Sequence, residues 1–138
     1  MDPQHNMLNS QKIATLLREQ AGAYIVVLFG SYAKGQVRRD SDVDIAFAGD
    51  TAITEYELFL LAQELAVMLG CEVDLLDLDR LSTVMKAQIV ATGKVIFCAD
   101  EVKRQYLFMR ALRDYANLSE DRAVVLESIA KRGTVYAS

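Results

Sequence analysis

Several residue types that common sites depend on are scarce in this chain. Its 138 residues include two cysteines, one histidine, one proline and no tryptophan. Cys71 and Cys98 stand far apart with no histidine nearby, so we expect no structural zinc site and interpret both as reduced core cysteines. No apolar run approaches the roughly 20 residues that span a bilayer, and the first residues lack a signal-peptide pattern. These absences favour a cytoplasmic protein without membrane attachment.

An excess of either charge is also missing. The chain has 15 basic and 19 acidic residues, which gives a net charge of −4. A dedicated nucleic-acid-binding protein usually carries a basic face, so the composition argues against direct binding to nucleic acid. Because 52% of the residues are hydrophobic, a chain of this length is predicted to build one domain around its own core.

Helical and extended patterns alternate along the chain. We predict strands over residues 24–29, 42–48, 72–78 and 94–98. We predict helices from residue 9 or 10 to 20, over 54–69, from 82 to about 92 and from 100 to about 131, with a short helix from Ser31. In the second of these helices, four residues are spaced to face the core: Leu58, Leu61, Leu65 and Met68. The alternation indicates an α/β domain, and the close spacing of the first two strands favours a mixed sheet.

The expected domain consists of a core and a helical extension. Residues 1–98 are predicted to form the core, with a disordered start over about 1–8. Residues 99–138 are predicted to form a C-terminal helical extension packed on the same domain, with a break near 117–119. The large apolar side chains of this extension fit either packing on the sheet or contact with a partner: Tyr106, Phe108, Met109, Leu112 and Tyr115.

A glycine–serine turn followed by two aspartates is the most informative motif. Gly30-Ser31 follows an apolar run, and Asp42-Val43-Asp44 comes ten residues later. A glycine lets the backbone approach a ligand closely, and amides at a helix start point toward an anion, so this turn is predicted to bind phosphate. Asp42 and Asp44 point from the same face of a strand, and a divalent cation between them would relieve their repulsion. Oxygen ligands of this kind favour Mg²⁺.

A third carboxylate is predicted in the third strand. Val73-Asp74-Leu75 repeats the pattern of Val43-Asp44-Ile45, with one acidic residue inside an apolar strand. An aspartate in that position is costly without a partner or a metal, which favours Asp74. Asp77 and Asp79 lie nearer the strand end, where capping or solvation explains them, and Glu72 is interpreted as an exposed strand start.

These motifs together resemble a known family. The Gly-Ser pair, the ten-residue spacer, Asp-x-Asp and the later strand aspartate are similar to the pattern of polymerase-β-like nucleotidyltransferases. The compact layout resembles their smallest branch, the minimal nucleotidyltransferase (MNT) proteins, and the similarity runs from about Gln11 to Cys98. The resemblance implies an α/β fold made of a single polymerase-β-like nucleotidyltransferase domain, with a small mixed sheet flanked by helices.

The resemblance also implies roles for the motif residues. Asp42 and Asp44 would hold two Mg²⁺ ions, and Gly30 and Ser31 would bind the distal phosphates of ATP. Asp74 would contact the catalytic metal and activate the incoming hydroxyl. One departure is Tyr32, where many relatives have a basic residue, and nearby basic residues are candidates to replace it: Lys34, Arg38 and Arg39.

The acceptor of the nucleotide is left to competing hypotheses. In the first, which we expect, AMP moves from ATP to a protein hydroxyl, a tyrosine of a partner HEPN-domain ribonuclease toxin, for which the MNT protein is the antitoxin. In the second, the acceptor is a small molecule, as in aminoglycoside nucleotidyltransferases, although those relatives usually have a longer second domain. In the third, a non-catalytic antitoxin acts by binding alone, which three intact carboxylates argue against. RNA tailing fits the charge and size least well.

Overall fold

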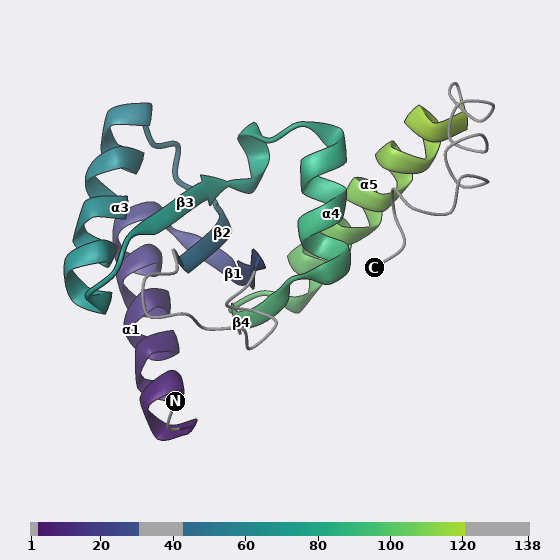
Figure 1. Ribbon diagram of the computed structural model, residues 1–138. Coiled ribbons are helices and arrows are strands. Elements are labelled where there is room, and N and C mark those ends of the chain that lie inside the picture. The colour runs from purple at the N-terminus through teal and green to yellow at the C-terminus, as the bar shows by residue number, and fades with distance from the viewer. Residues whose placement is uncertain (1–2, 31–42, 121–138) are drawn as a thin grey trace, which may run out of the picture.

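A four-stranded sheet with helices on both faces forms the centre of the protein (Figure 1). The structure is a computed structural model that describes residues 3–30 and 43–120. The strands are β1 (Ala23–Phe29), β2 (Val43–Gly49), β3 (Val73–Asp77) and β4 (Lys94–Cys98), and their order in the sheet is β3-β2-β1-β4. β1 pairs antiparallel with β2 and β4, whereas β2 and β3 are parallel. The predicted mixed sheet is therefore confirmed.

The helices divide between the two faces of the sheet. They are α1 (Pro3–Ala21), α3 (Glu55–Leu69), α4 (Thr83–Thr92) and α5 (Glu101–Glu120), with a single 3₁₀ turn, η1 (Leu78–Arg80), after β3. α1 and α3 cover one face, where Leu17 and Leu65 pack against Val26 and Phe47. α4 and η1 cover the other, where Leu78 and Ile89 pack against Ile25, Val27 and Ala46, with side chains of α5 beside them. The sheet thus has two apolar cores.

Residue alternation along β2 decides which face each side chain joins. Val43, Ile45 and Phe47 are buried in the core under α1 and α3. Successive side chains of a strand point to opposite faces, so Asp44 lies on the face that carries α4. The same alternation in β3 buries Leu75 with the first core and sends Asp74 to the face of Asp44.

Three expected boundaries are wrong. α1 begins at Pro3, so most of the segment expected to be disordered is helical, and a proline suits the first turn of a helix because its φ is already helical. α5 continues through 117–119 to Glu120, since weak helix formers cost only a few tenths of a kcal/mol each inside a helix that is already formed. β3 ends at Asp77 because the chain turns into η1. The short helix expected from Ser31 and the segment after 120 lie outside the described residues.

The large apolar residues of α5 divide between its two sides. Phe108 and Tyr115 are half-buried, and Phe108 packs against the second core. Three others are exposed: Tyr106, Met109 and Leu112. Packing on the domain therefore explains only part of the apolar set.

The two cysteines are less buried than the predicted core positions. Cys71 and Cys98 are half-buried and form no disulfide. The thiol of Cys98 donates a hydrogen bond to the carboxylate of Glu101 at 3.4 Å, and burial raises the pKa of this thiol. Within the described residues, no helix has both the length and the hydrophobicity needed to cross a membrane.

A capping box at the start of α3 gives a stability prediction. The Glu57 amide donates to the Thr54 hydroxyl at 3.1 Å, and the Thr54 amide donates to the Glu57 carboxylate at 3.0 Å, which lowers the pKa of Glu57. A carboxylate with a lowered pKa stabilises the folded state above its unfolded pKa and loses that effect as it is protonated. We expect wild type to melt above Glu57→Gln at pH 7 and the difference to shrink as the pH falls below the ordinary glutamate pKa of about 4.3 and through the lowered pKa of folded Glu57. An equal difference at pH 3 would contradict this account.

Candidate active site

Asp44 and Asp74 are direct neighbours across the parallel pair of strands. The register of β2 and β3 pairs Asp44 with Asp74, and the same register pairs Val43 with Val73 and Ile45 with Leu75. Adjacent strands lie about 4.8 Å apart, and paired residues in a parallel sheet leave it on the same face. Asp44 is half-buried and Asp74 is exposed. The repeated Val-Asp pattern seen in the sequence therefore becomes two adjacent carboxylate side chains on one face.

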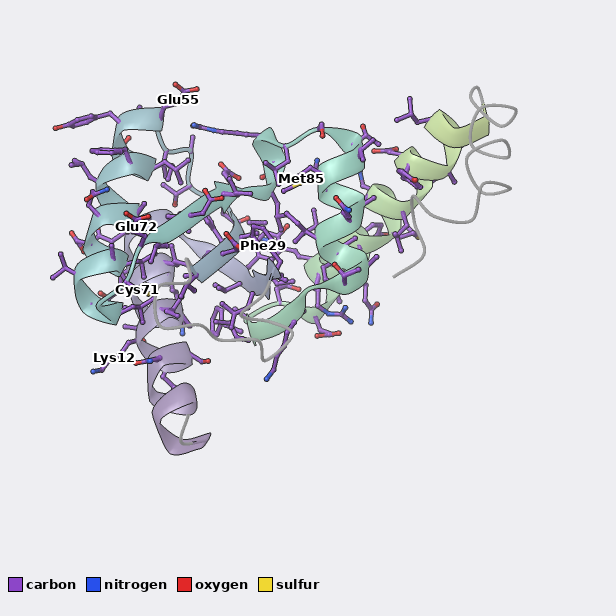
Figure 2. The ribbon with its side chains drawn as sticks, viewed as in Figure 1. Lys12, Phe29, Glu55, Cys71, Glu72 and Met85 are labelled. Carbon is purple, nitrogen blue, oxygen red and sulfur yellow. The ribbon has the colours of Figure 1, made fainter. Side chains whose placement is uncertain are left out.

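Gly30 lies against the carboxylate of Asp44. It follows Phe29, which Figure 2 labels at the end of β1. Phe29 is the partner of Asp44 in the antiparallel pair of β1 and β2. The φ of Gly30 is +72°, and a Cβ placed on it would lie 2.2 Å from Asp44 Oδ2. The sequence predicted that this glycine allows a ligand to approach. The structure adds a contact that no local sequence signal indicates: the missing side chain makes room for the aspartate.

Asp77 is used in local structure. Its carboxylate accepts a hydrogen bond from the Asp79 amide at 3.1 Å and forms an ion pair with Arg80 at 3.5 Å. The guanidinium of Arg80 also donates to the carbonyl oxygen of Ile53, so this group ties η1 to the segment before α3. The interpretation of Asp77 as a capping residue is confirmed.

Glu72 contributes through its backbone. Its side chain is exposed, as expected for a strand start, and Figure 2 shows it beside α3. Its carbonyl oxygen accepts the Val43 amide at 2.9 Å, which begins the pairing of β2 with β3. Glu72 therefore helps to set the register that aligns Asp44 with Asp74.

The other predicted site residues lie outside the described residues. These are Ser31 and Asp42, together with Tyr32, Lys34, Arg38 and Arg39. Among the described residues, no three His, Cys, Asp or Glu side chains gather as metal ligands would. The structure thus brings together Gly30, Asp44 and Asp74, and the roles of all five predicted site residues stay predictions.

A separate pocket of about 240 Å³ lies under α5, at the other end of the sheet. Its lining includes Tyr24, Asp79 and Arg110 but neither Asp44 nor Asp74. Burial, followed by the charges of nearby aspartates such as Asp79, raises the pKa of Tyr24, while Arg110 acts in the opposite direction. With charges of both signs and no contact with the paired aspartates, this pocket is not the candidate active site.

Known proteins resemble this chain in sequence and in fold. A family model described as "Polymerase beta, Nucleotidyltransferase" matches residues 11–102. The chain belongs to the polymerase β nucleotidyltransferase family. This match begins where the resemblance expected from the motifs begins and ends four residues beyond it.

Individual relatives show which members of the family this nucleotidyltransferase is similar to. The chain is 32% identical over 123 residues to the protein adenylyltransferase MntA of Shewanella oneidensis, covering 88% of both proteins. A toxin–antitoxin crystal structure with AMP-PNP has a chain that is 32% identical, with a TM-score of 0.79, over 88% of this chain and 98% of that one. A structure of tri-AMPylated Shewanella oneidensis HEPN toxin in complex with MNT antitoxin contains a chain that is 30% identical, with a TM-score of 0.73. The match covers 89% of this chain and 97% of that one.

The contact between Gly30 and Asp44 can be tested with a second glycine as control. Gly30 and Gly70 have nearly the same φ, +72° and +70°, but nothing lies within 4 Å of a Cβ at Gly70. We expect Gly30→Ala and Gly70→Ala to lose similar stability in urea unfolding, about 1–2 kcal/mol each. Only Gly30→Ala displaces Asp44, so it alone should slow AMP transfer from labelled ATP, by about 100-fold. Equal activity in the two variants would refute the positioning role of Gly30.

Proposed function

We propose that this protein moves AMP from ATP to a tyrosine of a partner HEPN-domain toxin and thereby acts as its antitoxin. The observation that carries the proposal is the in-register pair Asp44 and Asp74 beside Gly30. The similarity to a protein adenylyltransferase over 88% of both chains supports the same chemistry. We place the reaction in the cytoplasm, where ATP and newly made toxin are both available.

The carboxylates suit magnesium. Asp44 and Asp74 offer oxygen ligands, which Mg²⁺ prefers, and neighbouring carboxylates repel unless a cation lies between them. We assign Asp42, two residues before Asp44 in the sequence, as a further ligand. Two Mg²⁺ ions held by these three carboxylates would neutralise charge on the attacking and leaving oxygens of the transfer.

Groups of the protein itself bind the phosphates of ATP and accept the proton of the acceptor hydroxyl. The backbone at Gly30 and the hydroxyl of Ser31 bind the distal phosphates of ATP and hold the α-phosphate in line with the acceptor. Asp74 accepts the proton of the tyrosine hydroxyl while the tyrosine oxygen forms a bond to the α-phosphorus of ATP. The bond from this phosphorus to the bridging oxygen breaks, and pyrophosphate leaves.

A protein acceptor is favoured over the other hypotheses by the related structures. In one of them an MNT antitoxin is bound to a HEPN toxin that carries AMP groups, and in another a toxin–antitoxin pair is seen with AMP-PNP. AMP attached to a ribonuclease adds bulk and negative charge where RNA phosphates must bind, so modification inhibits it in two ways.

The role of Asp74 can be separated from that of Asp77. If Asp74 activates the acceptor, Asp74→Asn should slow single-turnover AMP transfer by about 100-fold or more, with a smaller effect on ATP binding in calorimetry. Asp77→Asn keeps an acceptor for the Asp79 amide and removes only the ion pair with Arg80, so it should change stability little while the rate per folded molecule is kept. A larger catalytic loss in Asp77→Asn would show that the wrong aspartate was chosen.

Modification of the toxin distinguishes enzymatic inhibition from inhibition by binding alone. A HEPN-domain toxin is co-expressed with wild type or with Asp42→Asn/Asp44→Asn, and the intact mass of the toxin is measured. We expect the toxin to gain AMP units with wild type only. When the antitoxin is scarce, we expect only wild type to protect cells from the toxin. A fully silenced toxin of unchanged mass would support binding alone and rule out the proposed reaction.

A further inference from the structure

The outward side of α3 carries large apolar side chains with no core to enter. Leu61 and Leu65 are buried on the inner side of this helix. Four residues on the outer side are exposed, by the fractions given: Tyr56 (68%), Phe59 (58%), Leu60 (45%) and Val67 (85%). Tyr56, Leu60 and Val67 follow helical spacing, so they form one stripe along the helix. Figure 1 shows α3 on the side of the molecule away from α4 and α5.

The charged residues of α3 itself all have one sign, and the nearby guanidinium of Arg80 is bonded to the Ile53 carbonyl and to Asp77. α3 contains Glu55, Glu57 and Glu64 and no lysine or arginine. Among the ion pairs of the described residues, none involves these three glutamates. A surface with an apolar centre and an acidic border is complementary to a partner with an apolar centre and a basic border.

A pocket beside the stripe has the chemistry of a receptor for a basic side chain. Its volume is about 220 Å³, and it is lined by Gln20, Ile53, Glu57, Leu60, Leu61 and Glu64. The aliphatic walls suit the stem of a lysine or arginine, and the two carboxylates suit its charged head. Glu57 is held in place by the Thr54 amide, and this bond favours its ionised form.

The stripe is close to the edge of the sheet that carries Asp74. α3 ends at Leu69, and β3, an edge strand packed beside α3, begins at Val73. Val67, the most exposed member of the stripe, lies in the last turn of α3, one short connection before that edge. A partner that rests on this end of α3 can therefore extend over β3 toward Asp74.

We propose that the stripe and the pocket of α3 form the docking surface for a basic protein partner, with a lysine or arginine of that partner in the pocket. The occupant rests on the proposed function: it is the ribonuclease toxin, which needs basic groups to bind RNA phosphates. A second copy of this chain fits less well, because a symmetric contact brings the acidic border of each copy against the other.

The binding test uses matched pairs on two helices. Toxin is titrated into the Asp44→Asn protein, so that binding is measured without AMP transfer. Tyr56→Ser/Val67→Ser removes apolar area from α3, and the control Val102→Ser/Tyr106→Ser removes an equivalent pair from α5, exposed by 63% and 61%. We expect the α3 pair to raise Kd at least about 10-fold and the α5 pair to change it less than about 2-fold. The reverse order overturns the proposal.

The pocket is tested by removing its charge while its shape is kept. Glu57→Gln/Glu64→Gln preserves an acceptor for the Thr54 amide, so α3 keeps its cap. We expect a Kd raised about 10-fold and a weaker salt dependence than in the parent protein, because the lost contacts are electrostatic. Unchanged affinity and salt dependence would refute the pocket as the anchor.

Separate results decide between this inference and the proposed function. AMP found on the toxin with normal binding by the α3 variants overturns the docking surface and leaves the reaction in place. If wild type binds the toxin through α3 but attaches no AMP to it, the proposed reaction is overturned and the docking surface stands. Toxin that does not bind the Asp44→Asn protein at all overturns the docking surface. A dimer of the protein alone that Tyr56→Ser/Val67→Ser converts to monomer, seen by ultracentrifugation, identifies the stripe as a contact between copies and also overturns it.

Discussion

The parallel register of β2 and β3 is the constraint on which the candidate active site depends. A slip of one residue would turn Asp74 to the opposite face from Asp44. The same slip would take Leu75 out of the core it shares with Val43 and Ile45. Burying each of these side chains stabilises the fold by about 1.5–3 kcal/mol. Two unit charges separated by about the 4.8 Å spacing of neighbouring strands repel by roughly 1–3 kcal/mol near a protein surface. Core packing therefore outweighs the repulsion and holds the two acidic groups together.

The sequence patterns predicted the parts of this arrangement that depend on periodicity. The inner stripe of α3 and the strand positions follow directly from residue spacing, and Asp74 was chosen because its surroundings repeat those of Asp44. The exact register and the contact of Gly30 with Asp44 depend on how separate strands meet, which no local pattern records. The start of α1 and the continuity of α5 through 117–119 differ from expectation because residue propensities there are small beside the stability of a helix already formed.

The outer stripe of α3 shows a different limit of reading a sequence. Residue spacing predicts the inner, core-facing stripe of α3 but assigns no role to the apolar residues on the other side of the helix. α3 is apolar on two sides, so its sequence alone does not tell a buried helix from one that binds a partner. Burial separates the two cases: Leu61 and Leu65 are enclosed, while Tyr56 and Val67 face outward.

The acidic residues on the two sides of β3 differ in their proposed functions. On the face of α4, Asp44 and Asp74 lie side by side, and we propose that a cation between them supports the transfer of the nucleotidyl group. On the face of α3, Glu57 and Glu64 are spread around an apolar surface, where an attached basic side chain can neutralise them. Because β3 is an edge strand, no further strand of the described sheet separates these two surfaces. In the proposed arrangement, a partner held by the second surface would be brought close to the first, which would raise the local concentration of its acceptor hydroxyl at Asp74.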